Sequence, residues 1–197
     1  MTPSSKLWKG RNKDKIILDL CGGTGSWSRP YREAGYDVRL ITFPDNDVRT
    51  YQPPDNVYGI LAAPPCTMFS RARTRAKTPR DIIGGLSVVD ACIRIIWRCK
   101  PNWWALENPD GLLKKYLGKA VWTFQPYHYG ESYSKRTSLW GNFIPPMFNP
   151  KRLSDQERAW AKTNSRPIKV KGSGLTVADI RAITPPLFAQ AFYEANK

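Results

Sequence analysis

The sequence LAAPPCTMFS at residues 61–70 joins a predicted strand to a loop that carries a cysteine. The small and branched apolar residues at 57–62 predict a buried strand, and Pro64-Pro65 end it because proline has no N–H group for a sheet. Cys66 follows at once, on a turn that two prolines make rigid. Taken alone, this pattern is more typical of a buried structural cysteine than of a nucleophile. The rest of the chain must decide between them.

Strands alternate with helices on both sides of this stretch, which predicts an α/β fold with a mostly parallel sheet flanked by helices. The expected strands are 15–20, 37–42, 57–62, 103–106, 121–129 and 137–140, and the expected helices are 28–34, 81–98, 154–162, 176–181 and 184–195. In parallel sheets the carboxyl ends of the strands line one edge. Residues that directly follow different strands are therefore expected to share one crevice.

The helix at 81–98 has a clear apolar face, formed by Ile82, Leu86, Val89, Ile93 and Ile96. This spacing predicts a packing helix, on which Cys92 and Cys99 are expected to be inert. The tryptophans at 97, 103, 104 and 122 are expected in the core.

The chain is strongly basic, with 31 Lys+Arg against 16 Asp+Glu and a formal net charge of +15 over 197 residues. Such an excess favours a polyanionic partner, of which nucleic acid is the commonest. A run of cations follows Cys66 and is predicted to contact DNA phosphates, although a solvated loop is the alternative: Arg71, Arg73, Arg75 and Lys77.

Other classes of protein are disfavoured by the composition. The four cysteines form no CxxC pair and His128 is the only histidine, so no metal site is expected. The first fifteen residues do not resemble a signal peptide, and no apolar run approaches the ~20 residues that span a bilayer. We expect a cytoplasmic protein with reduced thiols and no membrane partner.

The expected domain organisation is simple. Residues 1–14 form a basic lead-in, and residues 15–197 form a single domain. Within it, residues 142–175 form a short, irregular and partly basic insert before the last helices.

Three motifs follow predicted strands in chain order. Asp19-Leu20-Cys21-Gly22-Gly23-Thr24-Gly25-Ser26 is a glycine turn between a strand and a helix, Pro64-Pro65-Cys66 follows the middle strand, and Glu107-Asn108-Pro109 follows the next one. Together they resemble the C5-cytosine DNA methyltransferase family over about residues 15–195. The resemblance implies a Rossmann-like fold that binds S-adenosylmethionine.

The resemblance also assigns roles. Cys66 corresponds to the nucleophile of the PCxxFS motif, and Glu107 and Asn108 correspond to the family's EN pair. Arg136 lies near the place of an arginine-rich catalytic motif, although the match is loose. The implied cofactor residues are Asp19, Cys21, Gly23, Thr24, Gly25, Asp47 and Pro64. Cys21 stands where the family usually has Phe, and no acid ends the second strand, which leaves the ribose contact unassigned.

The chemistry explains why these residue types are needed. C5 of cytosine is a poor nucleophile, and attack of a thiolate on C6 makes C5 enamine-like and able to accept a methyl group. An acid at N3 assists this attack, and Glu107 is the candidate. The predicted function is transfer of a methyl group from S-adenosylmethionine to cytosine C5 in DNA, through a covalent adduct of Cys66.

Two other functions remain open from the sequence. A catalytically silent DNA-binding or accessory protein could keep the same fold, and RNA or a nucleotide could replace DNA as the substrate. Residues 142–175 are too short for the recognition domain that family members acting on defined sequences usually carry. We therefore expect weak sequence selectivity, or a protein partner that supplies it.

Overall fold

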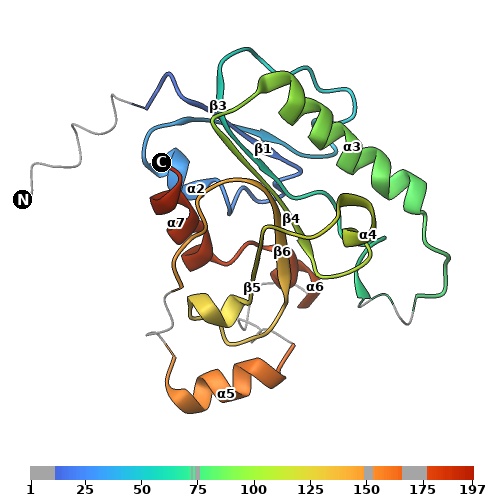
Figure 1. Cartoon of the computed structure of the whole chain (residues 1–197), viewed down its shortest axis with the longest axis vertical. Coiled ribbons are helices and arrows are strands. Elements are labelled where there is room, and N and C mark those ends of the chain that lie inside the picture. Colours follow the sequence, from blue (N-terminus) through green and yellow to red (C-terminus); the bar gives the residue numbers. More distant parts are fainter. Residues whose placement is uncertain (1–11, 72, 74–75, 149–152, 166–176) are drawn as a thin grey trace, which may run out of the picture.

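The structure, a computed structural model, describes residues 12–71, 73, 76–148, 153–165 and 177–197. A six-stranded sheet runs through its centre in the order β2-β1-β3-β4-β6-β5 (Figure 1). The strands are β1 (Ile16–Leu20), β2 (Asp37–Ile41), β3 (Val57–Ala62), β4 (Trp103–Pro109), β5 (Trp122–Phe124) and β6 (Thr137–Asn142). The helices are α2 (Arg29–Glu33), α3 (Ile82–Cys99), α4 (Lys114–Leu117), α5 (Asp155–Thr163), α6 (Val177–Ala182), α7 (Pro186–Ala195) and the 3-10 helix η2 (Pro126–Tyr129).

The pairing of the strands confirms the predicted mostly parallel sheet. β1 pairs in parallel with β2 and β3, and β3 pairs in parallel with β4. β6 pairs antiparallel with both β4 and β5. The strand order reverses between β1 and β3, and the carboxyl ends of parallel strands at such a point form a crevice where ligands bind.

Two hydrophobic clusters cover the two faces of the sheet. Leu18 and Ile60 pack with α3 residues such as Ile95 on one face, whereas their strand neighbours Ile17 and Leu61 pack with α2 and α7 on the other. Successive strand residues point to opposite faces, so a strand buried on both faces is apolar throughout. This explains the unbroken apolar runs of the central strands. Figure 1 shows α3 on one side of the sheet and α2 with α7 on the other.

Two details of the fold differ from the sequence-based expectations. The strand expected at 121–129 ends at Phe124, and Pro126–Tyr129 form η2. Pro126 cannot donate to a neighbouring strand, and His128 turns back so that its Nδ1 accepts from the Gln125 N–H at 3.2 Å. Trp97 is 74% exposed instead of buried. It lies three residues after the exposed Arg94, on the outer side of α3.

Some predicted features lie outside the described residues. The lead-in at 1–14 is described only from residue 12, and the insert at 142–175 only at 142–148 and 153–165. Within the described part, no helix is both long and apolar enough to cross a membrane.

Candidate active site

The turn after β1 brings the backbone close to a cavity. Cys21, Gly23 and Gly25 have φ values of 57°, 54° and 68°. These left-handed conformations are easy for glycine and uncommon for cysteine. A Cβ on Gly23 would meet nothing within 4 Å, whereas one on Gly22 would lie 2.3 Å from the Asp19 carboxyl group. The turn can therefore fold tightly over Asp19 and leave open space above Gly23.

Asp19 is a buried carboxyl group with one oxygen unused. The Ser28 hydroxyl donates to Oδ2 at 2.5 Å, while Oδ1 is buried and has no hydrogen-bond partner among the described residues. Burial raises the pKa of Asp19 to about 6, and the Ser28 hydrogen bond and Arg32 oppose that rise. An unpaired buried acceptor is costly, so Oδ1 is a strong candidate to receive a donor from a ligand.

Hydrogen bonds within the loop after β3 hold the backbone of Cys66. The N–H groups of Phe69 and Ser70 donate to the Cys66 carbonyl oxygen at 2.9 and 2.8 Å. Arg80 donates to the carbonyl oxygens of Met68 at 2.7 Å and Ser70 at 3.0 Å. Arg80, a few residues after the basic run, thus stabilises the loop that carries Cys66.

The Cys66 thiol lies among three charged side chains. Burial raises its pKa; Lys135 and Arg181 lower it, and Glu107 raises it. The thiol form is therefore favoured at rest, and the two cations counteract the cost of making a thiolate.

The end of β4 supplies an acid and an amide on opposite sides of the strand. Glu107 Oε1 lies 3.7 Å from the Lys135 ammonium, and both side chains are mostly buried, with 17% and 15% of their surface exposed. Asn108 is fully buried, and its Nδ2 donates to the Pro64 carbonyl oxygen at 2.9 Å. Because neighbouring strand residues point in opposite directions, Glu107 can face the cavity while Asn108 supports the proline turn.

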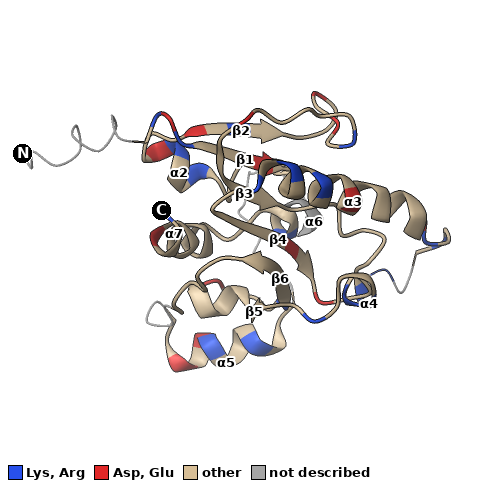
Figure 2. Cartoon of the chain, turned by 45° about the horizontal axis from the view of Figure 1, so that its top comes forward, with Lys and Arg blue, Asp and Glu red and all other residues tan. Residues whose placement is uncertain are grey.

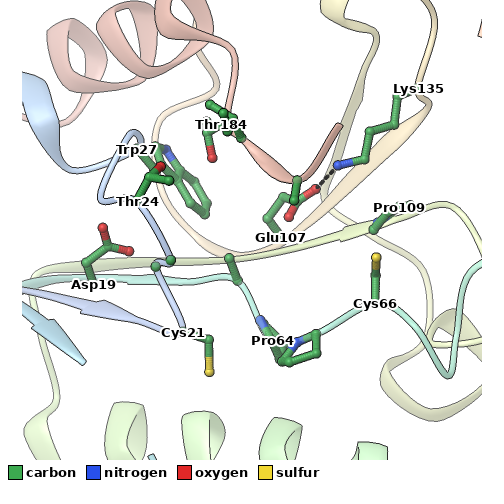
Figure 3. Close-up of a pocket in the computed structure, with 16 residues that line it drawn as sticks. Asp19, Cys21, Thr24, Trp27, Pro64, Cys66, Glu107, Pro109, Lys135 and Thr184 are labelled. Carbon is green, nitrogen blue, oxygen red and sulfur yellow. Dashed lines mark ion pairs between the residues drawn. The ribbon is translucent and has the colours of Figure 1, made fainter. Parts of the chain in front are cut away.

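These segments enclose one cavity of about 420 Å³, drawn in Figure 3. Its chemically distinctive lining residues are Asp19, Cys21, Thr24, Trp27, Cys66, Glu107, Lys135 and Thr184. Figure 3 shows Cys66 beside Pro109 and the Glu107–Lys135 ion pair across the cavity from the glycine turn. A second cavity of about 390 Å³ shares Cys21 and Pro65 with it, so the two adjoin.

Most of the residues predicted from sequence lie at these two cavities. Asp19, Cys21, Gly23, Thr24, Pro64, Cys66 and Glu107 line the first cavity. Asp47 lines the second, but its carboxylate already accepts hydrogen bonds from Arg49, with Nη2 to Oδ2 at 2.5 Å. Gly25 belongs to the glycine turn and Asn108 donates to the Pro64 carbonyl oxygen, and neither is among the lining residues.

Arg136 is placed differently from the expectation. It is exposed and is not among the lining residues of the cavity, and its carbonyl oxygen accepts from the Asp110 N–H at 2.8 Å. The preceding residue, Lys135, is the cation that faces Glu107. The residue of the Lys135-Arg136 pair that lines the cavity is therefore Lys135, and not Arg136 as expected.

The basic run after Cys66 is not uniformly available to a ligand. Arg71 is exposed and lies 3.9 Å from Asp110, and Lys77 is exposed. Arg73 Nη2 instead donates to Thr78 Oγ1 at 2.7 Å and to the Pro79 carbonyl oxygen at 3.0 Å. Arg75 lies outside the described residues. Figure 2 shows that further Lys and Arg residues are spread over α3 and α5.

Three further residues line the cavity although the sequence did not assign them to the site: Trp27, Lys135 and Thr184. Trp27 follows the glycine turn, and Thr184 begins the Thr184-Pro185-Pro186 segment, so their positions in sequence gave a weak signal. No group of three or more His, Cys, Asp or Glu residues in the described part of the chain is arranged to hold a metal ion.

Comparison with known proteins identifies one family. The model of the C-5 cytosine-specific DNA methylase family matches residues 31–134, more than half of the 197-residue chain. The match includes the Cys66 turn and Glu107-Asn108. No curated protein matches significantly.

A solved structure from E. coli is similar in part. It is a prophage-encoded protein described as a candidate DNA modification methyltransferase, 17% identical to this chain, with a TM-score of 0.47. The alignment covers 82% of this chain and 55% of that one, so the chain spans about half the length of that structure.

Proposed function

The chain belongs to the C-5 cytosine-specific DNA methylase family, and we propose that it transfers a methyl group from S-adenosylmethionine to C5 of cytosine in DNA. The observation that carries this proposal is the meeting of Cys66, after β3, and Glu107, in the last part of β4, in one cavity with the glycine turn after β1. A soft nucleophile and an acid in one cavity are what addition to the C6 atom of cytosine requires.

Cys66 is the proposed nucleophile. Its sulfur adds to C6 of cytosine, which gives C5 the electron density that it lacks in the aromatic ring. After C5 has taken the methyl group, loss of the C5 proton to a base breaks the S–C6 bond, restores the ring and releases the Cys66 thiolate; a fluorine at C5 blocks this last step. The buried thiol must first lose its proton, and its pKa is raised by burial. Lys135 and Arg181 supply positive potential that favours the thiolate.

Glu107 is the proposed acid. A proton or hydrogen bond from its carboxyl group to N3 stabilises the negative charge that thiolate addition places on the ring. Its partner Lys135, at 3.7 Å, holds the carboxyl group at the cavity wall. Asn108 acts indirectly, because its bond to the Pro64 carbonyl joins the acid's strand to the nucleophile's turn.

The glycine turn and the adjoining cavities fit S-adenosylmethionine, which supplies an electrophilic methyl group on a sulfonium centre. Asp19 Oδ1 is a buried acceptor without a partner among the described residues, suited to the cofactor's ammonium group. Gly23 leaves room for a close backbone approach. The volumes of about 420 and 390 Å³ lie within the range of ligand sites. Asp47 must share its carboxylate with Arg49 to contact the cofactor.

DNA is the proposed macromolecular substrate. Cys66 and Glu107 lie within a cavity and not on a protruding surface, so a cytosine in a duplex must leave the base stack to reach them, at a cost of a few kcal/mol. The exposed cations Arg71 and Lys77 follow Cys66 in the chain and are suited to hold the flanking phosphates.

The test is methylation in a defined system. The purified full chain is incubated with unmethylated duplex DNA and cofactor carrying a labelled methyl group, and the product is analysed by nucleoside mass spectrometry. We expect labelled 5-methylcytosine, and a covalent complex through Cys66 when 5-fluorocytosine replaces the target base. Cys66→Ala should abolish both, whereas Cys99→Ala, at the end of α3 and away from the cavity, should abolish neither.

The same experiment separates the alternatives. DNA binding without any methylated base would support the silent accessory protein and would contradict the proposal. Product formed on RNA but not on DNA would change the substrate and keep the chemistry.

A further inference from the structure

Asn164 and Ser165, the two residues that directly follow α5, accept hydrogen bonds from two segments that are distant in sequence and lie next to the active site. The Asn164 carbonyl oxygen accepts from Ser134 twice, from its N–H at 2.7 Å and from its hydroxyl at 3.1 Å. The Ser165 carbonyl oxygen accepts from the Arg181 guanidinium. We call these four residues, Ser134, Asn164, Ser165 and Arg181, the clasp.

The clasp fixes Lys135 at both ends. Ser134 precedes it in the chain, so the bonds to Asn164 anchor the backbone next to Lys135. Its ammonium donates to the Arg181 carbonyl oxygen at 2.9 Å and lies 3.7 Å from Glu107 Oε1. A lysine side chain has four rotatable bonds and a compact charge, so its position depends on such external contacts.

We propose that Ser134 and Arg181 are positioning residues that act through Lys135 and hold its ammonium at the cavity shared by Glu107 and Cys66. The inference rests on the proposed function only in taking Glu107 and Cys66 as the reacting pair. It assigns a role to Asn164 and Ser165, which lie within the short insert: these two residues support the catalytic centre itself.

The position of the ammonium has an electrostatic consequence for Cys66. The charged groups that face the thiol are Glu107 from β4, Lys135 from the loop before β6 and Arg181 from α6. Lys135 lowers the pKa of the thiol against the effect of burial. When the clasp is weakened, the ammonium can move away from the cavity, and the pKa of Cys66 should rise.

The primary measurement is the pH dependence of Cys66 alkylation by iodoacetamide in the full chain without DNA. Peptide mass spectrometry separates Cys66 from Cys21, which lines the same cavity. Ser134→Ala and Arg181→Met should move the midpoint to higher pH. Ser134→Thr keeps the hydroxyl and should restore the wild-type midpoint. Ser132→Ala is the matched control, because the hydroxyl two residues earlier makes no hydrogen bond among the described residues.

A double-mutant cycle distinguishes positioning from a general effect on the fold. If Ser134 acts through Lys135, Ser134→Ala should cause no further shift in a Lys135→Met background. Arg181→Met should retain only the smaller shift due to its own charge. An equal shift in both backgrounds, or an unchanged midpoint for Ser134→Ala, would overturn the proposal.

Turnover gives a second readout. Arg181→Met should lower kcat by about tenfold, the scale expected when a catalytic group is displaced by less than 1 Å. The KM for DNA should change by less than about twofold, since a positioning residue does not hold the substrate. A raised KM with unchanged kcat would contradict the inference. If the wild-type chain methylates nothing, the alkylation profiles still decide it, so its failure is distinguishable from failure of the proposed function.

Discussion

Asn108 donates a buried 2.9 Å hydrogen bond from Nδ2 to the carbonyl oxygen of Pro64, a residue that lines the active-site cavity. This bond joins the carboxyl end of β4 to the turn after β3. Asn108 is next to Glu107 in the chain, and Pro64 is two residues before Cys66. The distance between acid and nucleophile therefore depends on a buried side chain that does not itself line the cavity.

Removal of this bond should affect both stability and turnover. Asn108→Ala leaves the Pro64 carbonyl oxygen without its donor, which should cost about 1–3 kcal/mol of unfolding free energy in urea denaturation. The rate of methylation should fall as well, because the turn that carries Cys66 loses its support. Asn102→Ala, just before β4 and exposed, is the control and should change neither quantity. A slower enzyme with unchanged stability would instead indicate that Asn108 contacts the substrate.

Glu107→Gln tests the acid. The amide keeps the size of the side chain but cannot deliver a proton to N3, so kcat should fall by about 10²–10⁴-fold. DNA affinity, measured by fluorescence anisotropy, should change far less. Glu33→Gln, on the exposed side of α2, serves as the matched control. Parallel losses in turnover and affinity would point to a structural role for Glu107.

Asp19 should make cofactor binding depend on pH. Its pKa is raised to about 6 by burial, and an ammonium ligand requires the ionised form. The dissociation constant for S-adenosylmethionine, measured by calorimetry, should therefore rise about tenfold for each unit that the pH falls below about 6. Asp19→Asn should bind weakly and lose this dependence. An identical pH profile in the variant would show that another group is responsible.

The same carboxyl group should make the free energy of unfolding of the cofactor-free protein depend on pH. Its pKa is higher in the folded chain, about 6, than the ordinary value of 3.8, so between these values the folded state binds more protons than the unfolded state. The free energy of unfolding should thus fall as the pH rises from below 3.8 through about 6, and the total fall due to Asp19 should be about 3 kcal/mol. Asp19→Asn should show a flatter dependence of unfolding free energy on pH from 4 to 8.

Phosphate contacts should come from particular residues of the basic run after Cys66. Arg71 and Lys77 are exposed, and loss of either should reduce the slope of log affinity against log salt by ~0.9 on duplex DNA. Arg73 donates to the Thr78 and Pro79 residues of its own loop. Arg73→Ala should therefore alter the loop and leave the slope close to that of the wild type. A reduced slope for Arg73→Ala would mean that Arg73 leaves these contacts when DNA binds.

The sequence by itself determined the layers of the fold and the members of the site that follow strands. Apolar runs at 16–20 and 57–62 and the apolar face of α3 are local patterns, and burial of those patterns drives the chain into a two-sided sheet. Because the carboxyl ends of parallel strands meet, the positions of Cys66 and Glu107 directly after β3 and within the end of β4 were enough to predict that they share a crevice.

The tertiary structure alone decided which cations serve the site and which serve the fold. Lys135 and Arg136 are adjacent and alike in sequence, yet Lys135 faces Glu107 and Arg136 faces solvent. Arg73 and Arg71 are also alike in sequence, yet Arg73 donates to Thr78 and Pro79 of its own loop whereas Arg71 is exposed. The direction of a long charged side chain in a loop depends on acceptors supplied by distant segments, such as the Arg181 carbonyl oxygen for Lys135, and no local periodicity encodes them.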